Sequence, residues 1–115
     1  MKLNFIRILF LFFIFNIPNH LYAGDLLLGK EKAATVCSAC HGMDGQAASG
    51  GNSSLTPNIT AQEKEYLLAK LKDYKSGKIN HPQMSLIAQM LSNEDIENVS
   101  EWYSKIKISI ELPLE

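Results

Sequence analysis

The chain has 115 residues, of which 46% are hydrophobic, and its formal net charge is −1. The first 23 residues contain two basic and no acidic side chains, so the remaining 92 residues hold nine lysines, no arginine and twelve acidic residues. Their formal charge of −3 argues against a nucleic-acid-binding protein, which would be strongly basic on one face, and their length suits one small domain.

The first 23 residues have the pattern of a secretory signal peptide. Lys2 and Arg7 give a positive start, apolar residues follow at 8–15, and a polar stretch ends on the small residue Ala23. Leu21 is larger than the residue usual at the third position before a cut, so an uncleaved anchor is the alternative. The apolar run is shorter than the roughly 20 residues of a membrane span. We therefore expect cleavage after Ala23, export, and no stable membrane span in the mature chain.

The segment from Asp25 to Val36 is predicted to be the first helix of a domain that covers residues 24–107. Asp25 is a suitable N-cap, and Leu28, Ala33 and Val36 offer one apolar side. This helix leads directly into the most informative motif of the chain.

Residues 37–41 read Cys-Ser-Ala-Cys-His, which is the attachment signature of c-type haem. In this pattern Cys37 and Cys40 can each form a thioether bond to one vinyl group of the porphyrin, and His41 can offer a ring nitrogen to the iron. A thioredoxin-like redox pair would need a βαβ neighbourhood. A structural zinc site would need both cysteines together with His41 and His81. We therefore predict one covalently bound haem c.

Residues 42–57 are rich in Gly, Ser, Asn and Ala, and they are predicted to form a long loop around the cofactor. Thr60 and Glu63 fit a capping box at the start of a second helix, and Gly77 is a suitable end for it. Between them, apolar and aromatic side chains follow at helical spacing, namely Tyr66, Leu67, Leu71 and Tyr74.

A second axial ligand for the iron must come from further along the chain. Met84 follows an irregular segment and could place its sulfur over the ring, whereas Met90 could equally be core packing. Met43 lies too close to His41 in sequence to reach the opposite face. His81 is the rival ligand, and a bis-histidine site would have a lower reduction potential than a His/Met site.

The last helix is predicted to begin at a weaker capping box formed by Ser92 and Asp95. Its apolar residues recur at helical spacing, and they are Ile96, Val99, Trp102, Tyr103 and Ile106. No strand pattern precedes residue 104, so the fold class is all-α. Residues 108–115 form a C-terminal tail in which apolar side chains alternate with polar residues or proline. We expect this tail either to lie against a partner or to fold back or fray.

From Gly24 to about Ile106 the chain resembles a short bacterial class I cytochrome c. The haem motif, the methionine segment and the final helix together carry this resemblance. The matching stretches are Gly29-Lys30, residues 37–45, Pro57-Asn58-Ile59, Tyr66-Leu67, Leu71, residues 74–78, Met84-Ser85, Ile87-Ala88, residues 91–96 and Trp102-Tyr103. The resemblance implies three to four helices around one covalently bound haem.

The resemblance also implies roles for individual residues. Cys37 and Cys40 would hold the haem, His41 would be the proximal ligand and Met84 the distal ligand. The backbone oxygen of Pro57 would accept the proton on the other ring nitrogen of His41, which fixes the tautomer of the ligand.

Two further positions concern the crossing of the first and last helices. Gly29 matches the small residue that lets these helices approach closely. Ala33 stands where many relatives have an aromatic residue, so we expect Trp102 or Tyr103 to fill that space.

The resemblance implies a periplasmic electron carrier that passes single electrons between redox partner proteins, and not an enzyme. An iron with two axial ligands leaves no position for a substrate. The alternative is the haem subunit of a larger dehydrogenase, because residues 74–78 and Ile87-Ala88 also resemble the cytochrome subunit of flavocytochrome c sulfide dehydrogenase. In that case a flavoprotein partner would do the chemistry. A haem sensor or peroxidase, the third hypothesis, would need an open or displaceable sixth ligand.

Overall fold

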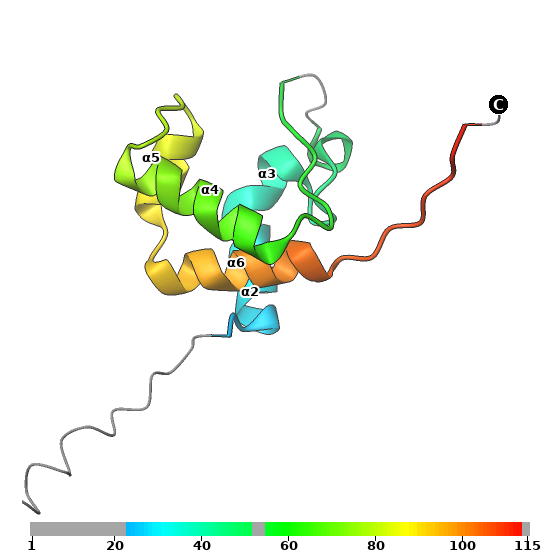
Figure 1. The fold of residues 1–115 in the computed structure, drawn as a ribbon, viewed down its shortest axis with the longest axis horizontal. Helices are drawn as coiled ribbons and strands as arrows, with labels where there is room; N and C mark the ends of the chain where they lie inside the picture. Colours follow the sequence, from blue (N-terminus) through cyan, green and yellow to red (C-terminus); the bar gives the residue numbers. More distant parts are fainter. Residues whose placement is uncertain (1–22, 52–54, 114–115) are drawn as a thin grey trace, which may run out of the picture.

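A computed structural model of the chain describes residues 23–51 and 55–113. Within these ranges every regular element is a helix, so the expected all-α class is confirmed. In chain order the elements are α2 (Leu26–Lys32), the π-helix η1 (Ala33–Cys37), α3 (Ser38–His41), the 3₁₀-helix η2 (Ala47–Gly50), α4 (Lys64–Ser76), α5 (Met84–Met90) and α6 (Asn93–Lys105) (Figure 1). The signal peptide expected over residues 1–23 lies outside the described residues apart from Ala23, and it stays a prediction.

The described helices are all short compared with the thickness of a lipid bilayer. The longest, α4 and α6, have 13 residues each, whereas a span needs about 20 apolar residues. No helix in the described ranges therefore meets the requirements of a membrane-spanning segment.

The first helix begins as predicted and then departs from the α-helical form. Asp25 is the N-cap, and its carboxylate accepts hydrogen bonds from the backbone N–H groups of Leu27 and Leu28 at 2.8 and 2.9 Å. The helix expected to end at Val36 changes into the π-helix η1 at Ala33 and continues through α3 to His41. The haem motif therefore lies within continuous helical backbone.

The first and last helices cross in close contact, as Gly29 led us to expect. A β-carbon at Gly29 would collide with the backbone oxygen of Asn98 and would lie 3.1 Å from the β-carbon of Trp102. The backbone N–H of Asp25 also donates to the side-chain oxygen of Asn98, at 2.7 Å. The crossing of α2 over α6 forms the base of the domain (Figure 1).

The small hydrophobic core lies above this crossing. Ala33, Leu67 and Tyr103 are buried together, and the half-buried side chain of Trp102 packs against them. The aromatic residues of α6 thus fill the space beside Ala33, as expected. Burial of these apolar surfaces is the main favourable contribution to the stability of the domain.

The second helix does not begin at the predicted capping box. α4 starts at Lys64, its N-cap is Glu63, and no side chain caps it. The Thr60 hydroxyl instead donates to the backbone oxygen of Asp44 at 2.6 Å. Ala61 adopts a positive φ of 54°, which turns the chain away from helical geometry before α4 begins. Gly77 ends the helix in a left-handed conformation, as predicted.

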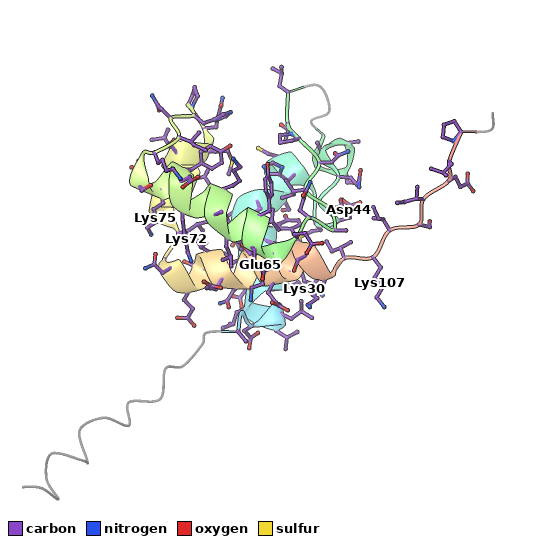
Figure 2. The ribbon with its side chains drawn as sticks, in the orientation of Figure 1. Lys30, Asp44, Glu65, Lys72, Lys75 and Lys107 are labelled. Carbon is purple, nitrogen blue, oxygen red and sulfur yellow. The ribbon has the colours of Figure 1, made fainter. Side chains whose placement is uncertain are left out.

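α4 connects the other helices of the domain. Lys64 forms an ion pair with Glu101 of α6 at 2.9 Å. The Lys75 ammonium group donates to the backbone oxygen of Leu91, just beyond α5. Lys72 and Lys75 both lie on α4 where it faces these neighbours (Figure 2). Because an ion pair near the surface contributes little to stability, we regard the Lys64–Glu101 pair as orienting α4 against α6 more than stabilising the domain.

The last helix begins at the complete capping box that was predicted. The Ser92 hydroxyl accepts from the backbone N–H of Asp95 at 2.9 Å, and the Asp95 carboxylate accepts from the backbone N–H of Ser92 at 2.8 Å. After Lys105 the chain is extended and projects from the domain (Figure 1). The side chains of Ile108, Ile110 and Leu112 are exposed there.

Candidate functional site

A cavity of about 380 Å³ lies between the helices, and all five residues singled out in the sequence line it. These residues are Cys37, Cys40, His41, Pro57 and Met84. Aliphatic and aromatic side chains form much of the remaining wall, namely Val36, Ile59, Tyr66, Leu67, Leu71, Tyr74, Ile87, Leu91, Val99 and Tyr103. A mainly apolar cavity with a few convergent polar groups is typical of a cofactor site.

The π-helix η1 places the two cysteines on the cavity wall. A π-helix contains more residues in each turn than an α-helix, so it changes the direction in which the following side chains point. Cys37 is half-buried and Cys40 is exposed, and they do not form a disulfide. Burial raises the pKa of the Cys37 thiol to about 11, and the neighbouring Cys40 adds to this effect. An uncharged thioether is therefore better suited to this position than a thiolate.

His41 is held in a defined orientation. Its ring is buried, and its Nδ1 atom lies 2.9 Å from the backbone oxygen of Pro57. Because that oxygen can only accept a hydrogen bond, the proton of the neutral ring is on Nδ1. The lone pair on Nε2 is then available to a metal.

Two aromatic side chains of α6 hold the backbone that follows His41. The Tyr103 hydroxyl donates to the backbone oxygen of Gly42 at 2.9 Å, and the Trp102 ring N–H donates to that of Met43 at 3.1 Å. Burial raises the pKa of the Tyr103 hydroxyl, so this donor stays protonated. The sequence pattern assigned both aromatic residues to core packing and did not predict these hydrogen bonds. Helical spacing does not show which acceptor a ring hydroxyl or N–H group will meet.

Asp44 organises the loop that carries Pro57. Its carboxylate accepts from the backbone N–H of Gln46 at 2.9 Å and from the Ser49 hydroxyl at 2.8 Å. These hydrogen bonds hold the pKa of Asp44 below its usual value. Figure 2 shows Asp44 in this loop, on the side of the molecule from which the tail projects.

Asn58, next to Pro57, forms a further hydrogen bond to the same loop. Its side-chain oxygen accepts from the backbone N–H of Ala47 at 2.9 Å. The N–H of Ile59 donates to the backbone oxygen of Gly45 at 2.8 Å. The loop thus fixes the carbonyl that meets His41.

Met84 is the one candidate sixth ligand that lines the cavity. It is half-buried at the first position of α5, a helix that the sequence pattern did not lead us to expect. Met90 is 73% exposed and lies outside the cavity lining. Met43 and His81 also lie outside the lining.

The donor groups around the cavity fit a haem better than a bare metal ion. In the described ranges no group of three His, Cys, Asp or Glu side chains is placed to hold a metal, which does not favour a structural zinc site. The described ranges also contain no strand from which a βαβ unit could be built. Two thiols, a histidine with a free Nε2 and a thioether on an apolar cavity wall match the groups that attach and ligate a c-type haem.

Comparison with known proteins decides between these possibilities, because residues 26–107 match the cytochrome c family. The chain belongs to the cytochrome c family. It is therefore an electron carrier of that family with one covalently bound haem c, and its single Cys-x-x-Cys pair is consistent with one attachment site.

Three known proteins illustrate what this cytochrome c is similar to. Cytochrome c-554(548) from Halomonas halodenitrificans is 41% identical over 85 residues, which is 71% of this chain and 96% of the relative. The cytochrome subunit of sulfide dehydrogenase from Chlorobaculum tepidum is 30% identical over 66% of this chain and 64% of the relative. The crystal structure of reduced cytochrome c4 from Pseudomonas stutzeri superposes with a TM-score of 0.65 at 31% identity.

The match to cytochrome c4 covers 76% of this chain and 48% of the other, so this cytochrome c spans about half of that protein. By contrast, it matches nearly the whole length of cytochrome c-554(548). These likenesses confirm the cytochrome c fold that was expected from the sequence.

Proposed function

We propose that this cytochrome c is an exported, periplasmic carrier that passes single electrons between redox partner proteins through a His/Met-ligated haem. Residues 1–23 would be removed as a signal peptide, residues 24–107 would form the haem domain, and residues 108–115 the tail. The signal pattern around Lys2, Arg7 and Ala23 supports export.

Five side chains or backbone groups would hold the haem. Cys37 and Cys40 would form the two thioether bonds, His41 would ligate the iron through Nε2, and Met84 would supply sulfur from the other side. Pro57 would keep the His41 proton on Nδ1. When bound, the haem supplies an iron that takes up and releases one electron.

The surroundings of the cavity suit electron transfer without substrate chemistry. Two protein ligands would leave the iron no open position for a substrate. A soft thioether ligand opposite the histidine favours the reduced iron and raises the reduction potential. The apolar wall would limit the access of water to a bound haem, which would also favour the less charged reduced state.

One observation carries the proposal. The Nδ1 atom of His41 lies 2.9 Å from Pro57 O, and the same cavity is lined by both cysteines and by Met84. Under the proposal, the bond to Pro57 would orient His41 as one ligand, and Met84 on the same cavity would be the second. A histidine or a methionine without a role at a cofactor would have no need of this arrangement.

Replacing the sulfur ligand tests this proposal. Met84→Ala should abolish the sulfur-to-iron absorption band at the red end of the oxidised spectrum, because it removes the thioether from the cavity. Met90→Ala is the matched control, since this methionine is exposed and lies outside the lining. If the band survives in Met84→Ala, Met84 is not the ligand, and loss of the band in Met90→Ala would make Met90 the ligand instead.

A second candidate function is the haem subunit of a larger dehydrogenase. It is favoured by the likeness to the sulfide dehydrogenase subunit and by the exposed apolar side chains of the tail, which could lie along a partner. Purification of the native protein would separate the two. A stoichiometric flavoprotein in the purified material supports the subunit, and a lone monomer supports the carrier.

A further inference from the structure

The turn before Met84 is closed by hydrogen bonds within residues 79–85. The Ser85 hydroxyl accepts from the backbone N–H of His81 at 3.0 Å and donates to the backbone oxygen of Ile79 at 3.2 Å. The N–H of Ile79 donates in turn to Asp73 O of α4, at 3.1 Å. The turn is therefore joined to the helix that forms one side of the cavity.

His81 lies within this turn, and its side chain contacts the backbone of Met84. Its Nδ1 atom accepts from the N–H of Met84 at 3.2 Å and from the N–H of Gln83 at 3.3 Å. Since Nδ1 is an acceptor here, the proton of the neutral ring is on Nε2. The His81 ring also packs edge-on against Tyr74, with centroids 5.9 Å apart and planes at 69°.

Tyr74 lines the same cavity as Met84, so the imidazole connects the methionine backbone to a lining residue of α4. The histidine itself is outside the lining, and its Nδ1 is already committed to the backbone. These contacts give His81 a role different from the rival ligand that the sequence allowed.

We propose that His81 is a positioning residue that holds the Met84 backbone in place and so keeps the sulfur directed into the cavity. This inference rests on the proposed His/Met ligation. With Met84 as a ligand, displacement of its sulfur would require residues 81–84 to rearrange or the Met84 rotamer to change. An acceptor on the Met84 N–H opposes the first of these movements, so its loss makes the sulfur easier to displace.

Displacement of the sulfur by added imidazole measures this effect in the oxidised, haem-loaded protein. His81→Phe keeps an aromatic ring against Tyr74 but removes the acceptor. His81→Asn removes the ring but keeps an acceptor, because its amide oxygen can occupy the place of Nδ1. We expect His81→Phe to bind imidazole about tenfold more tightly than wild type, which corresponds to about 1.4 kcal/mol. His81→Asn should bind it within about twofold of wild type.

Ser85→Ala is the matched control, because Ser85 closes the same turn through its hydroxyl without touching the Met84 N–H. We expect its imidazole affinity to change less than that of His81→Phe. Denaturant unfolding of each variant would show whether a change in affinity follows overall stability. The inference would be overturned if His81→Phe bound imidazole with wild-type affinity. It would also be overturned if His81→Asn or Ser85→Ala changed the imidazole affinity as much as His81→Phe does.

The failure of this inference can be distinguished from failure of the proposed function. If the wild-type protein itself lacks the sulfur-to-iron band, the proposed Met84 ligation is wrong, and the role inferred for His81 is then wrong as well. If the band is present and depends on Met84, an unchanged His81→Phe variant overturns the inference alone.

Discussion

Gly29 shows how a single residue controls the crossing of α2 and α6, through its close approach to Asn98. With hydrogen in place of a β-carbon at Gly29, the backbone of α2 reaches the backbone of α6 at Asn98. The close crossing brings η1 and the haem motif over α6, where Tyr103 and Trp102 bond to the backbone beyond His41. The position of the cysteines therefore depends on a residue that does not touch the cavity.

Gly29→Ala should destabilise the protein, because its β-carbon would overlap the backbone oxygen of Asn98. We expect the free energy of unfolding to fall by about 1–3 kcal/mol, the range typical of overpacking. Denaturant unfolding of the haem-loaded protein checks this. Leu27→Ala, on the same helix but at a side chain that is 77% exposed, should change stability little. Equal stability of Gly29→Ala and wild type would contradict the close crossing.

Single residues also show where sequence reasoning succeeded and where it did not. The role expected for Gly29 depends on size alone, and the structure agrees with it. Thr60 has the right spacing from Glu63 for a capping box, but its hydroxyl bonds to Asp44 sixteen residues earlier. A local pattern cannot show that a distant carbonyl will compete for the same hydroxyl.

At the scale of elements, η1 and α5 were not foreseen. Helical spacing of apolar residues does not distinguish a π-helix from an α-helix, so η1 could not be read from the sequence, and its first residue, Ala33, is buried with Leu67 and Tyr103. α5 has only seven residues, and its buried positions, Ser85 and Ala88, are small. Such a short helix is stabilised by contacts with α4 more than by its own propensity. By contrast, the capping signals of α2 and α6 depend on neighbouring residues, and both were correct.

The capping box of α6 should make stability depend on pH through Asp95. Burial alone would raise the pKa of Asp95, but hydrogen bonds from the Ser92 N–H and from Lys32 outweigh it and lower the pKa. A carboxylate with a lowered folded-state pKa stabilises the protein above the unfolded pKa of about 3.9, and this contribution is lost as pH falls through the folded pKa. We expect Asp95→Ala to cost about 1 kcal/mol at pH 7.

Thermal unfolding between pH 3 and pH 7 would measure this difference. The difference in stability between wild type and Asp95→Ala should be constant near neutrality. It should begin to narrow near the unfolded-state pKa of about 3.9 and shrink further as pH falls through the lower folded-state pKa of Asp95, where the folded carboxylate takes up its proton. Asp95→Asn is the matched control, because it can accept the Ser92 N–H without a charge. A gap that does not change with pH would show that the charge of Asp95 contributes nothing.

For the whole molecule, the domain and the tail are distinct. The helices enclose the cavity, whereas residues 106–113 extend from the end of α6, with Lys107 on the projecting segment (Figure 2). Ile106 packs against the core, but Ile108, Ile110 and Leu112 are 53%, 75% and 81% exposed. The period-2 pattern left open whether the tail lies against a partner, folds back or frays. It could not indicate what the apolar side contacts, because a partner surface leaves no trace in this sequence.

Deletion of residues 108–115 should leave the domain unchanged. The exposed isoleucines and leucine bury little surface within the chain, so the haem spectrum and the free energy of unfolding should match those of the full protein. Absorption spectra and denaturant unfolding check this. Loss of haem or a marked loss of stability on deletion would mean that the tail belongs to the core. Ile106→Ala, at a residue packed against the core, is the positive control and should be destabilising.

The central claim is that one cavity brings together the residues that attach and ligate a single haem c. The most direct test is an experimental structure of the oxidised, haem-loaded protein. We predict thioether bonds at Cys37 and Cys40, iron bound by His41 Nε2 and by the sulfur of Met84, and the His41 Nδ1 bond to Pro57 retained. Iron bound by His81 or Met90 in place of Met84, or a haem outside this cavity, would contradict the account.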